Sequence, residues 1–293
     1  MNAPSESPFE SLDPLPQERT IGDIIRDTRK LKASHVERIL AYQREYGVRF
    51  GEAAVALKLA SPDDVVHALA QQFQYPFATE MQRDRCPELV VLNDPFSKQA
   101  EAIRAIRSQI TMRLFQKPDA RRALAVISPE SKDGKSFFAA NIAASLAQLG
   151  GRTLLIDADL RTPRQHEIFG LADRAGLSAI LSGRSRSRVI QEVHGLPGLF
   201  VLPVGTIPPN PLELLERSAF GLVVHELAAK FDHVVVDTSA ASLGSDPAVV
   251  AARCGATLMI ARRDQTRVDA LRKMVASLEN TSTHLAGVIV NEH

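Results

Sequence analysis

The sequence is poor in cysteine, has no long apolar run and carries almost no net charge. Its 293 residues include two cysteines, Cys86 and Cys254, which lie far apart and match no metal-ligand spacing. Such sparse cysteines predict reduced thiols in a cytoplasmic protein. No apolar run approaches the roughly 18 to 20 residues of a membrane span, and the first residues lack a basic-then-apolar signal. We therefore expect any work at a membrane to depend on a partner that holds the protein there.

The balance of charge also excludes some partners. A formal net charge of +1 gives no reason to expect nucleic acid or an anionic lipid surface as a ligand. An apolar content of 45% and a charged content of 24% are typical of a globular protein. The length suffices for one large domain and one small one.

The central motif joins a short apolar run, 123–127, to a polar loop and then to a helical pattern. Gly134, Lys135 and Ser136 stand where the loop becomes the helix. Backbone N–H groups at a helix start attract an anion, a lysine reaches β- and γ-phosphates, and a hydroxyl can ligate Mg²⁺. The motif predicts a phosphate-binding loop, although Pro129 replaces its usual first glycine and an ordinary helix start has the same pattern. The neighbouring residues are expected to contact the nucleotide too: Ser131, Lys132, Asp133 and Phe137.

Carboxylates follow two further apolar runs. Residues 153–156 lead into Asp157 and Asp159, and residues 233–236 lead into Asp237. The carboxyl ends of parallel strands meet at one edge of a sheet, where such folds bind their ligands. Asp157 and Asp237 suit Mg²⁺ held through water, and Asp159 could accept a proton from a hydroxyl. Together with Lys135 they form the predicted catalytic set, and three such strand ends favour Mg-ATP binding over chance surface turns.

Strand-like and helix-like segments alternate from residue 97 to the last residue. Long helical patterns cover 97–115 and 212–229. Alternation with short connections predicts an α/β fold with a mostly parallel sheet that helices cover on both faces. With the phosphate-loop motif, this is a P-loop NTPase fold.

The first hundred residues divide into three predicted parts. Residues 1–19, rich in proline and polar residues, predict a disordered tail. Residues 20–76 contain a repeat with an offset of 29 and predict a small, all-helical tandem-repeat module, in which Ser34 and Ser61 are candidate N-caps. Residues 77–96 predict a linker to the nucleotide-binding domain at 97–293.

The helical module resembles the N-terminal domain of type II secretion and type IV pilus ATPases. Some of those domains bind cyclic di-GMP through paired motifs that begin Arg-Leu-Gly. Here the motifs begin 20–22, Thr-Ile-Gly, and 49–51, Arg-Phe-Gly. A later motif glycine is replaced by Arg29 and Lys58. The first interpretation is a purely structural module, and of the functional alternatives a docking role is favoured over cyclic di-GMP binding.

The second domain resembles the bacterial tyrosine kinases, above all the soluble kinases paired with a chain-length determinant in exopolysaccharide export. Five segments carry this resemblance: 128–136, 154–163, 176–178, 202–211 and 234–237. The resemblance implies Mg-ATP-dependent phosphorylation of tyrosine, with Asp157 and Asp237 organising Mg²⁺ and Asp159 activating the acceptor. It also implies a transmembrane chain-length determinant as partner, a role in chain length and export, and a location at the cytoplasmic side of the inner membrane.

The same resemblance assigns a helix to oligomer formation and a residue to adenine. Glu101, Arg104 and Arg107 match a ring-forming helix of the family, although their spacing also fits a solvated face. Asn291 is expected to contact adenine as in related P-loop ATPases, although a strand-end turn has the same pattern.

A departure from the family leaves an alternative open. The sequence has three tyrosines, Tyr42, Tyr46 and Tyr75, all before the kinase domain, so we do not expect autophosphorylation of a tyrosine-rich tail. The alternative is a catalytically weak, nucleotide-gated oligomeric switch like the septum-site and partition ATPases. Those ATPases carry a second lysine where this sequence has Glu130, which favours the kinase.

Overall fold

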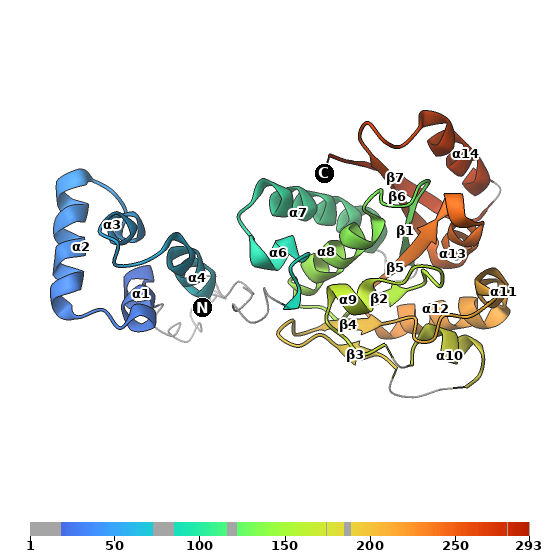
Figure 1. Ribbon diagram of the computed structural model, residues 1–293, viewed down its shortest axis with the longest axis horizontal. Helices are drawn as coiled ribbons and strands as arrows, with labels where there is room; N and C mark the ends of the chain where they lie inside the picture. Colours follow the sequence, from blue (N-terminus) through green and yellow to red (C-terminus); the bar gives the residue numbers. More distant parts are fainter. Residues whose placement is uncertain are drawn as a thin grey trace, which may run out of the picture. The chain divides into compact units, whose positions relative to one another are not determined.

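The computed structural model describes residues 19–72, 85–115, 122–173, 175–184, 189–279 and 281–292. The chain forms two compact units, Met1–Phe77 and Ala78–His293, and Figure 1 shows a helical unit and an α/β unit. The predicted tail lies, except for residue 19, outside the described residues. Within the described ranges, no helix has the length and apolar character needed to cross a bilayer.

The first unit contains four described helices, which confirms the predicted all-helical module. They are α1 (Ile21–Arg29), α2 (Ala33–Tyr46), α3 (Phe50–Ala56) and α4 (Pro62–Gln72). Ile24, Ile25 and Ile39 form its core with small alanines. Gly51 allows α3 to approach α4 closely, because a Cβ at this position would lie 2.6 Å from Cγ1 of Val65.

Helix starts in this unit follow the repeat only in part. Thr20 and Asp23 form a capping box at α1, and 29 residues later the Glu52 side chain accepts a hydrogen bond from the backbone of Arg49 at α3. Ser61 behaves as predicted, since its hydroxyl accepts a hydrogen bond from the backbone N–H of Asp64 at 3.2 Å. The prediction for Ser34 is wrong, because α2 begins at Ala33 and its N-cap residue is Lys32, which makes no side-chain cap.

The second unit is built on a seven-stranded sheet in the order β3-β4-β2-β5-β1-β6-β7. All described neighbours are parallel except β3 and β4. This confirms the mostly parallel sheet. The strands are β1 (Ala123–Ser128), β2 (Thr153–Asp157), β3 (Gln191–Glu192), β4 (Leu199–Leu202), β5 (His233–Ala240), β6 (Gly255–Arg262) and β7 (His284–Asn291).

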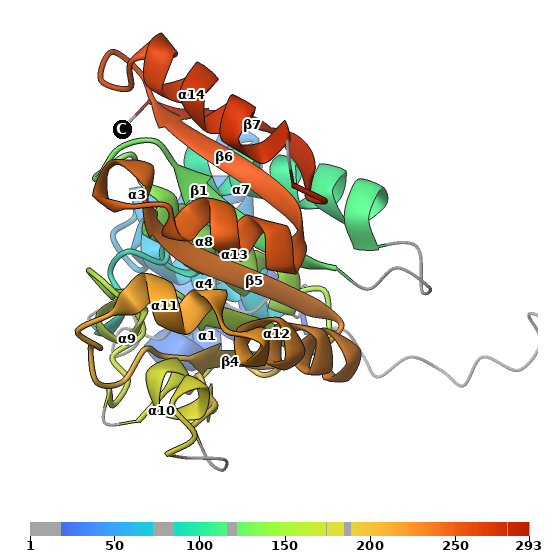
Figure 2. The same cartoon turned by 90° about the vertical axis from the view of Figure 1, so that its right-hand side faces the viewer.

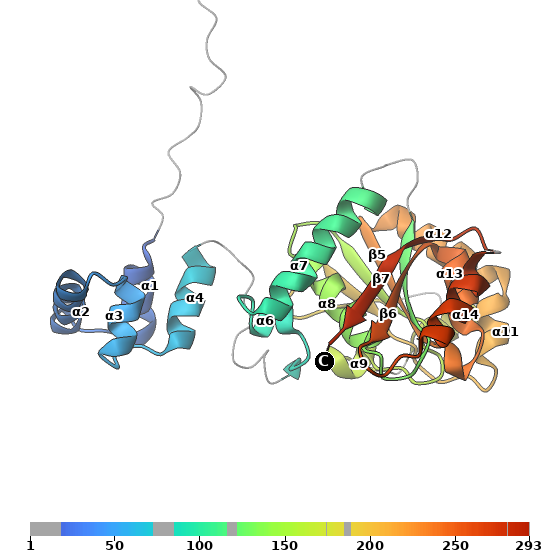
Figure 3. The same ribbon diagram turned by 90° about the horizontal axis from the view of Figure 1, so that it is seen from above.

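Helices cover both faces of this sheet, as predicted. Figure 3 shows α7 (Lys98–Ile110) and α8 (Lys135–Ala147) on one side, and Figure 2 looks onto the face covered by α12 (Ser218–Lys230), α13 (Asp246–Cys254) and α14 (Val268–Glu279). Successive residues of a strand face opposite sides, so Leu124 and Val126 join one core while Ala125 and Ile127 join the other. The remaining helices of the described segments are α6 (Val90–Asn93), α9 (Gln165–Ile168), α10 (Leu177–Leu181) and α11 (Pro211–Glu216), with a π-helical turn at Thr111–Phe115 and a 3₁₀ turn at Ala241–Leu243.

Two expected segments differ from the structure. The helix expected over 212–229 is interrupted at Arg217, whose φ of −58° and ψ of 143° are extended, so α11 and α12 are separate. The predicted linker 77–96 is described from residue 85, and this described part packs into the second unit. Leu89 and Val91 are fully buried there, and the Asn141 side chain on α8 accepts a hydrogen bond from the Val91 N–H. Apolar side chains at these positions make the segment part of the core.

Candidate functional site

The phosphate loop runs from the end of β1 to the start of α8. Gly134 is the N-cap of this 13-residue helix and has a φ of +95°, a conformation that favours glycine. A Cβ on Gly134 would also lie 2.3 Å from Nδ2 of Asn291, so a larger residue would displace the Asn291 amide. The helix start therefore presents backbone N–H groups to an anion, as the motif predicts.

Side chains from β6, β7 and the turn after β6 form hydrogen bonds with this loop. Asp133 accepts hydrogen bonds from the Thr266 hydroxyl at 2.8 Å and from the Glu130 N–H at 2.9 Å. Asn291 donates to the Asp133 carbonyl at 3.1 Å, and Arg262 donates to the Lys132 carbonyl at 3.2 Å. Burial raises the pKa of Asp133. The Asp133 side chain therefore holds the loop, while Ser131 and Lys132 stay exposed to solvent.

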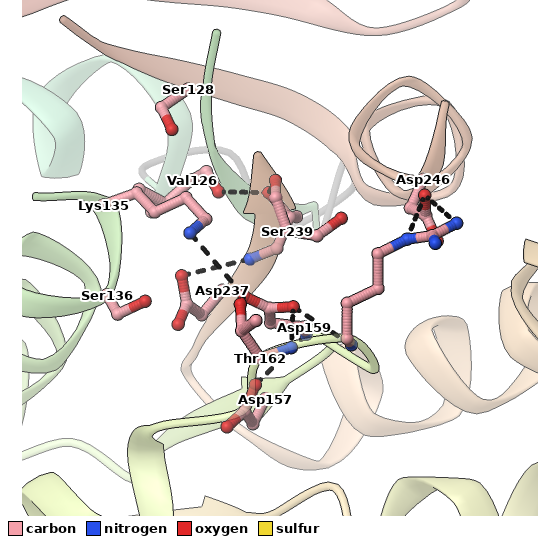
Figure 4. Close-up of polar contacts among 12 residues, drawn as sticks. Val126, Ser128, Lys135, Ser136, Asp157, Asp159, Thr162, Asp237, Ser239 and Asp246 are labelled. Atoms are coloured by element: carbon pink, nitrogen blue, oxygen red, sulfur yellow. Dashed lines mark hydrogen bonds and ion pairs between the residues drawn. The ribbon is translucent and has the colours of Figure 1, made fainter. Parts of the chain in front are cut away.

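The predicted catalytic residues lie together at the end of β2, within the neighbouring strand β5 and at the start of α8, and β5 continues to Ala240 beyond the expected strand end at Asp237. Asp157 on β2 is directly paired with Asp237 on β5. The Lys135 ammonium lies 3.6 Å from Oδ2 of Asp159. Figure 4 shows these side chains and Ser136 around one site. The site thus combines an anion-binding helix start, an ammonium group, a hydroxyl and three carboxylates.

This cluster carries more negative than positive charge. Asp157 and Asp237 are fully buried and Asp159 is 1% exposed, with Lys135 the one cation placed among them in the described structure. Burial raises the pKa of Asp157 well above its usual value, and the nearby Asp237 raises it further. Burial also raises the pKa of Asp237, although Lys135 opposes this effect. Three ionised carboxylates beside one ammonium leave an excess that a divalent cation would neutralise.

The donor set suits a hydrated cation better than a directly ligated one. Among the described residues there is no group of three or more His, Cys, Asp or Glu side chains arranged to hold an ion by themselves. Mg²⁺ usually keeps several waters and takes one or two protein ligands besides phosphate oxygens. The Ser136 hydroxyl fits as a direct ligand, and Asp157 and Asp237 fit as acceptors for its waters.

Asp159 is fixed in place by the segment that follows β2. Its Oδ1 accepts a hydrogen bond from the Thr162 N–H at 2.9 Å, and its Oδ2 accepts one from the Thr162 hydroxyl at 2.8 Å. The Arg161 side chain turns away and binds Asp246 on α13 at 3.0 Å. This leaves the Asp159 carboxylate facing Lys135.

Sequence reasoning missed one residue of this cluster, Gln165. Its side-chain amide donates to Oδ2 of Asp237 at 2.7 Å and to the Ser136 carbonyl at 3.1 Å. Its backbone N–H donates to Oδ2 of Asp157 at 3.0 Å. No sequence pattern signals this role, because the residue reaches the site only through the fold of the segment between β2 and α9.

An apolar cavity of about 370 Å³ lies beside the loop. Gly134, Phe137 and Asn291 line it together with side chains of α7, β6 and β7. Its size and apolar lining are those of a site for an aromatic ring of a small ligand. Asn291 thus contacts both the loop and this cavity.

The comparisons with known proteins agree with this geometry. The family described as the CobQ/CobB/MinD/ParA nucleotide binding domain matches residues 124–293. A putative tyrosine-protein kinase, CapB of Staphylococcus aureus, is 32% identical over 206 residues, which cover 70% of this chain and 89% of CapB. The chain belongs to the bacterial tyrosine kinases.

Other bacterial tyrosine kinases match the same part of the chain. The tyrosine-protein kinase ptk of Acinetobacter johnsonii is 35% identical over 192 residues, 65% of this chain and 26% of that protein. The kinase domain of Escherichia coli ETK has a TM-score of 0.66 and 30% identity, covering 69% of this chain and 79% of that structure. The chain spans about a quarter of the length of several of these relatives. A septum site-determining protein, MinD of Pyrococcus horikoshii, shares the fold at 19% identity and a TM-score of 0.51.

The predicted ring-forming helix of this bacterial tyrosine kinase does not present its three residues together. On α7, Arg104 pairs with Glu101 at 2.6 Å, and Glu101 is 70% exposed. Arg107 instead donates to the carbonyl and the hydroxyl of Ser145 on α8, at 2.9 and 3.2 Å. Its turn toward the core leaves Glu101 and Arg104 as the part of the motif that can face another protein.

The helical unit departs from the predicted motif at one position. Lys58 has a φ of +56°, as a replaced glycine would, but in the first repeat the left-handed residue is Lys30 rather than Arg29. Arg29 still belongs to α1 and pairs with Asp64 at 2.7 Å.

A cavity of about 440 Å³ in this unit is lined by Gly22, Leu40 and Phe50 among others. Tyr75 lies outside the described residues.

Proposed function

We propose that this chain is a Mg-ATP-dependent protein tyrosine kinase. The observation that carries the proposal is the cluster of Lys135, Asp157, Asp159 and Asp237, which the start of α8 and the adjacent strands β2 and β5 bring together. Membership in the bacterial tyrosine kinases supports the choice of a tyrosine hydroxyl as acceptor.

Each group has a role in phosphoryl transfer. The loop N–H groups and Lys135 bind the β- and γ-phosphates, and the apolar cavity with Asn291 receives the adenine ring. When bound, Mg²⁺ neutralises charge on the phosphates. Ser136 would ligate it, and Asp157 and Asp237 would orient its waters.

Asp159 is proposed as the base. The tyrosine oxygen forms a bond to the γ-phosphorus as the bond from that phosphorus to the bridging oxygen of ADP breaks. The phenolic proton passes to the Asp159 carboxylate, which Lys135 and Thr162 hold in position. The products are phosphotyrosine and ADP.

We extend the proposal to the cellular setting on the resemblance given above. The kinase acts with a transmembrane chain-length determinant at the cytoplasmic side of the inner membrane, and regulates exopolysaccharide chain length and export. Glu101 and Arg104 contribute to contact with a second copy, because the side chain of Glu101 is 70% exposed and pairs with Arg104.

Replacing Asp159 with Asn tests the assignment. The protein is incubated with Mg-ATP and the candidate membrane partner, and phosphosites are mapped by mass spectrometry. We expect wild-type protein to form phosphotyrosine, and Asp159→Asn to lose it while binding of a fluorescent ATP analogue persists. Unchanged phosphotyrosine in the variant would reject Asp159 as the base.

A nucleotide-gated switch is the second candidate, because the matching family also contains MinD and ParA. It predicts oligomers that form and dissociate with ATP, followed by size-exclusion chromatography, and no phosphotyrosine in any fraction. Phosphotyrosine in the same fractions would instead support the kinase.

A further inference from the structure

Gln165 connects the residues that surround the proposed metal position. It is the first residue of α9 and fully buried. Its side chain contacts Asp237 and Ser136, and its backbone contacts Asp157. One residue therefore contacts both carboxylates assigned to Mg²⁺ and the backbone of Ser136, whose hydroxyl is the third assigned group.

The direction of the Gln165 amide follows from its partners. The Asp237 carboxylate and the Ser136 carbonyl can only accept hydrogen bonds, so the NH₂ end must face them. The opposite end, Oε1, is buried and makes no hydrogen bond within the described structure. Because Oε1 and Nε2 share one carbon atom, this unpaired acceptor lies close to the Asp237 carboxylate and the Ser136 backbone that Nε2 contacts.

A buried carbonyl oxygen without a donor is unfavourable for the fold, and its persistence calls for a partner. A water molecule bound to a divalent cation is a strong donor of the required kind. We propose that Gln165 is a positioning residue of the magnesium site: its NH₂ end fixes Asp237 and Ser136, and its Oε1 accepts a hydrogen bond from the hydration shell of the ion. This proposal rests on the proposed binding of Mg-nucleotide.

The residue type agrees with this role. A carboxylate at position 165 would add a fourth negative charge next to Asp157 and Asp237, and a lysine would compete with the cation for them. A neutral amide supplies one donor and one acceptor without changing the charge of the site. Mutation of residues that hydrogen-bond to metal ligands commonly lowers metal affinity by about 10- to 100-fold.

The test separates metal affinity from nucleotide affinity. In Gln165→Met the unbranched shape is kept and both polar ends are lost. In Gln165→Asn the amide is kept but is one methylene too short to reach both partners. Binding of N-methylanthraniloyl-ADP to the full chain is measured by fluorescence, first in EDTA and then during a Mg²⁺ titration.

We expect the half-saturating Mg²⁺ concentration to rise about tenfold in both variants. Nucleotide affinity in EDTA should stay within about twofold of wild type, because the phosphate loop is unchanged. Glu167→Gln is the matched control, since Glu167 lies on the same helix with its side chain 63% exposed, and it should behave as wild type.

Three outcomes decide the matter. A magnesium shift in either variant, with unchanged affinity in EDTA, supports the proposal, so one well-folded variant suffices. Equal losses with and without Mg²⁺ would show a merely structural residue, and wild-type titrations in both variants would overturn the role entirely. If wild-type protein binds no nucleotide even with Mg²⁺, the proposed function fails first, and with it the basis of this inference.

Discussion

The pKa values of key aspartates are shifted in opposite directions in the two units. In the helical unit, a hydrogen bond from Thr20 lowers the pKa of Asp23 at an exposed helix start. Burial alone would raise the pKa of Asp64, but hydrogen bonds from Arg29 and Ser61 outweigh it and lower the pKa. In the α/β unit, burial raises the pKa of Asp157 and Asp237. Asp23 and Asp64 stabilise the first unit in their charged form, whereas Asp157 and Asp237 in the second are costly to keep charged.

That contrast shows how a functional site can be distinguished from structural polarity. Helix caps and surface ion pairs satisfy groups that the fold itself creates. Asp157 and Asp237 accept hydrogen bonds from Gln165, yet burial still raises their pKa, and such clustered buried carboxylates indicate a ligand. The contrast leads to four predictions, given from the largest expected effect to the smallest.

Replacing Lys135 with Met should separate function from stability most sharply. We expect tyrosine phosphorylation to fall by about 10²- to 10³-fold, as when a preorganised charge-stabilising group is removed. The melting temperature should change much less, because Asp157 and Asp237 already have raised pKa values and can take up a proton when the ammonium is lost. Lys273→Met, at an exposed position, should leave both measurements unchanged. Wild-type transfer by Lys135→Met would contradict the site.

Ile39→Ala should lower stability and leave nucleotide binding unchanged, the reverse of Lys135→Met. Ile39 is fully buried in the core of the helical unit, so its truncation is expected to cost about 2–5 kcal/mol of that unit's stability. Urea unfolding followed by far-ultraviolet circular dichroism measures this loss. Mg-nucleotide binding should not change, because no residue of the site comes from this unit, and Leu40→Ala at a 40% exposed position is the control. Lost nucleotide binding in Ile39→Ala would contradict the separation.

The two units should respond to pH with opposite sign. Asp157 and Asp237 bind protons more tightly when folded, so the α/β unit without ligand should lose stability as pH rises from about 4 through their raised pKa values. Asp64 has a lowered pKa, so the helical unit should instead lose stability as pH falls below about 4. Thermal unfolding from pH 3 to 8 tests this, and Mg-ADP should flatten the slope of the α/β unit. Parallel slopes in both units would disprove the comparison.

The smallest effect concerns a single helix cap. Thr20→Ala removes the hydroxyl that accepts the Asp23 N–H, and should cost about 1 kcal/mol of the helical unit's stability. Ser34→Ala is the informative partner, since Ser34 caps no helix and should change the stability by less than about half of that. Equal losses in both would restore the sequence-based assignment of Ser34.

Sequence was sufficient wherever one short pattern determines the local structure. The apolar runs before Asp157 and Asp237 favoured buried strands, and the parallel pairing of these strands places the two aspartates side by side. The phosphate loop could likewise be predicted, because Gly134 and Lys135 form a short local pattern at the start of a helix. These features depend on residues that are neighbours in the sequence.

The rest depended on contacts between distant segments. Gln165 reaches the site from a loop whose path has no sequence signature. Arg107 has the spacing of a surface motif, yet Ser145, 38 residues away, offers it a buried carbonyl. The break at Arg217 contains neither glycine nor proline, so the helical periodicity continued across it. Contacts of this kind, between segments distant in sequence, override the conformational preferences of the local sequence.

The last strand, β7, has irregular pairing near its start and an additional hydrogen bond at its end. Its pairing with β6 is irregular near Gly287, while its final residue, Asn291, is hydrogen-bonded to the phosphate loop. Val288 and Val290 remain exposed at this edge of the sheet. Local opening of the edge should therefore start at His284 and reach the nucleotide end last. Amide hydrogen exchange along β7 would then become slower toward Asn291, and occupancy of the phosphate loop would slow it most at that end.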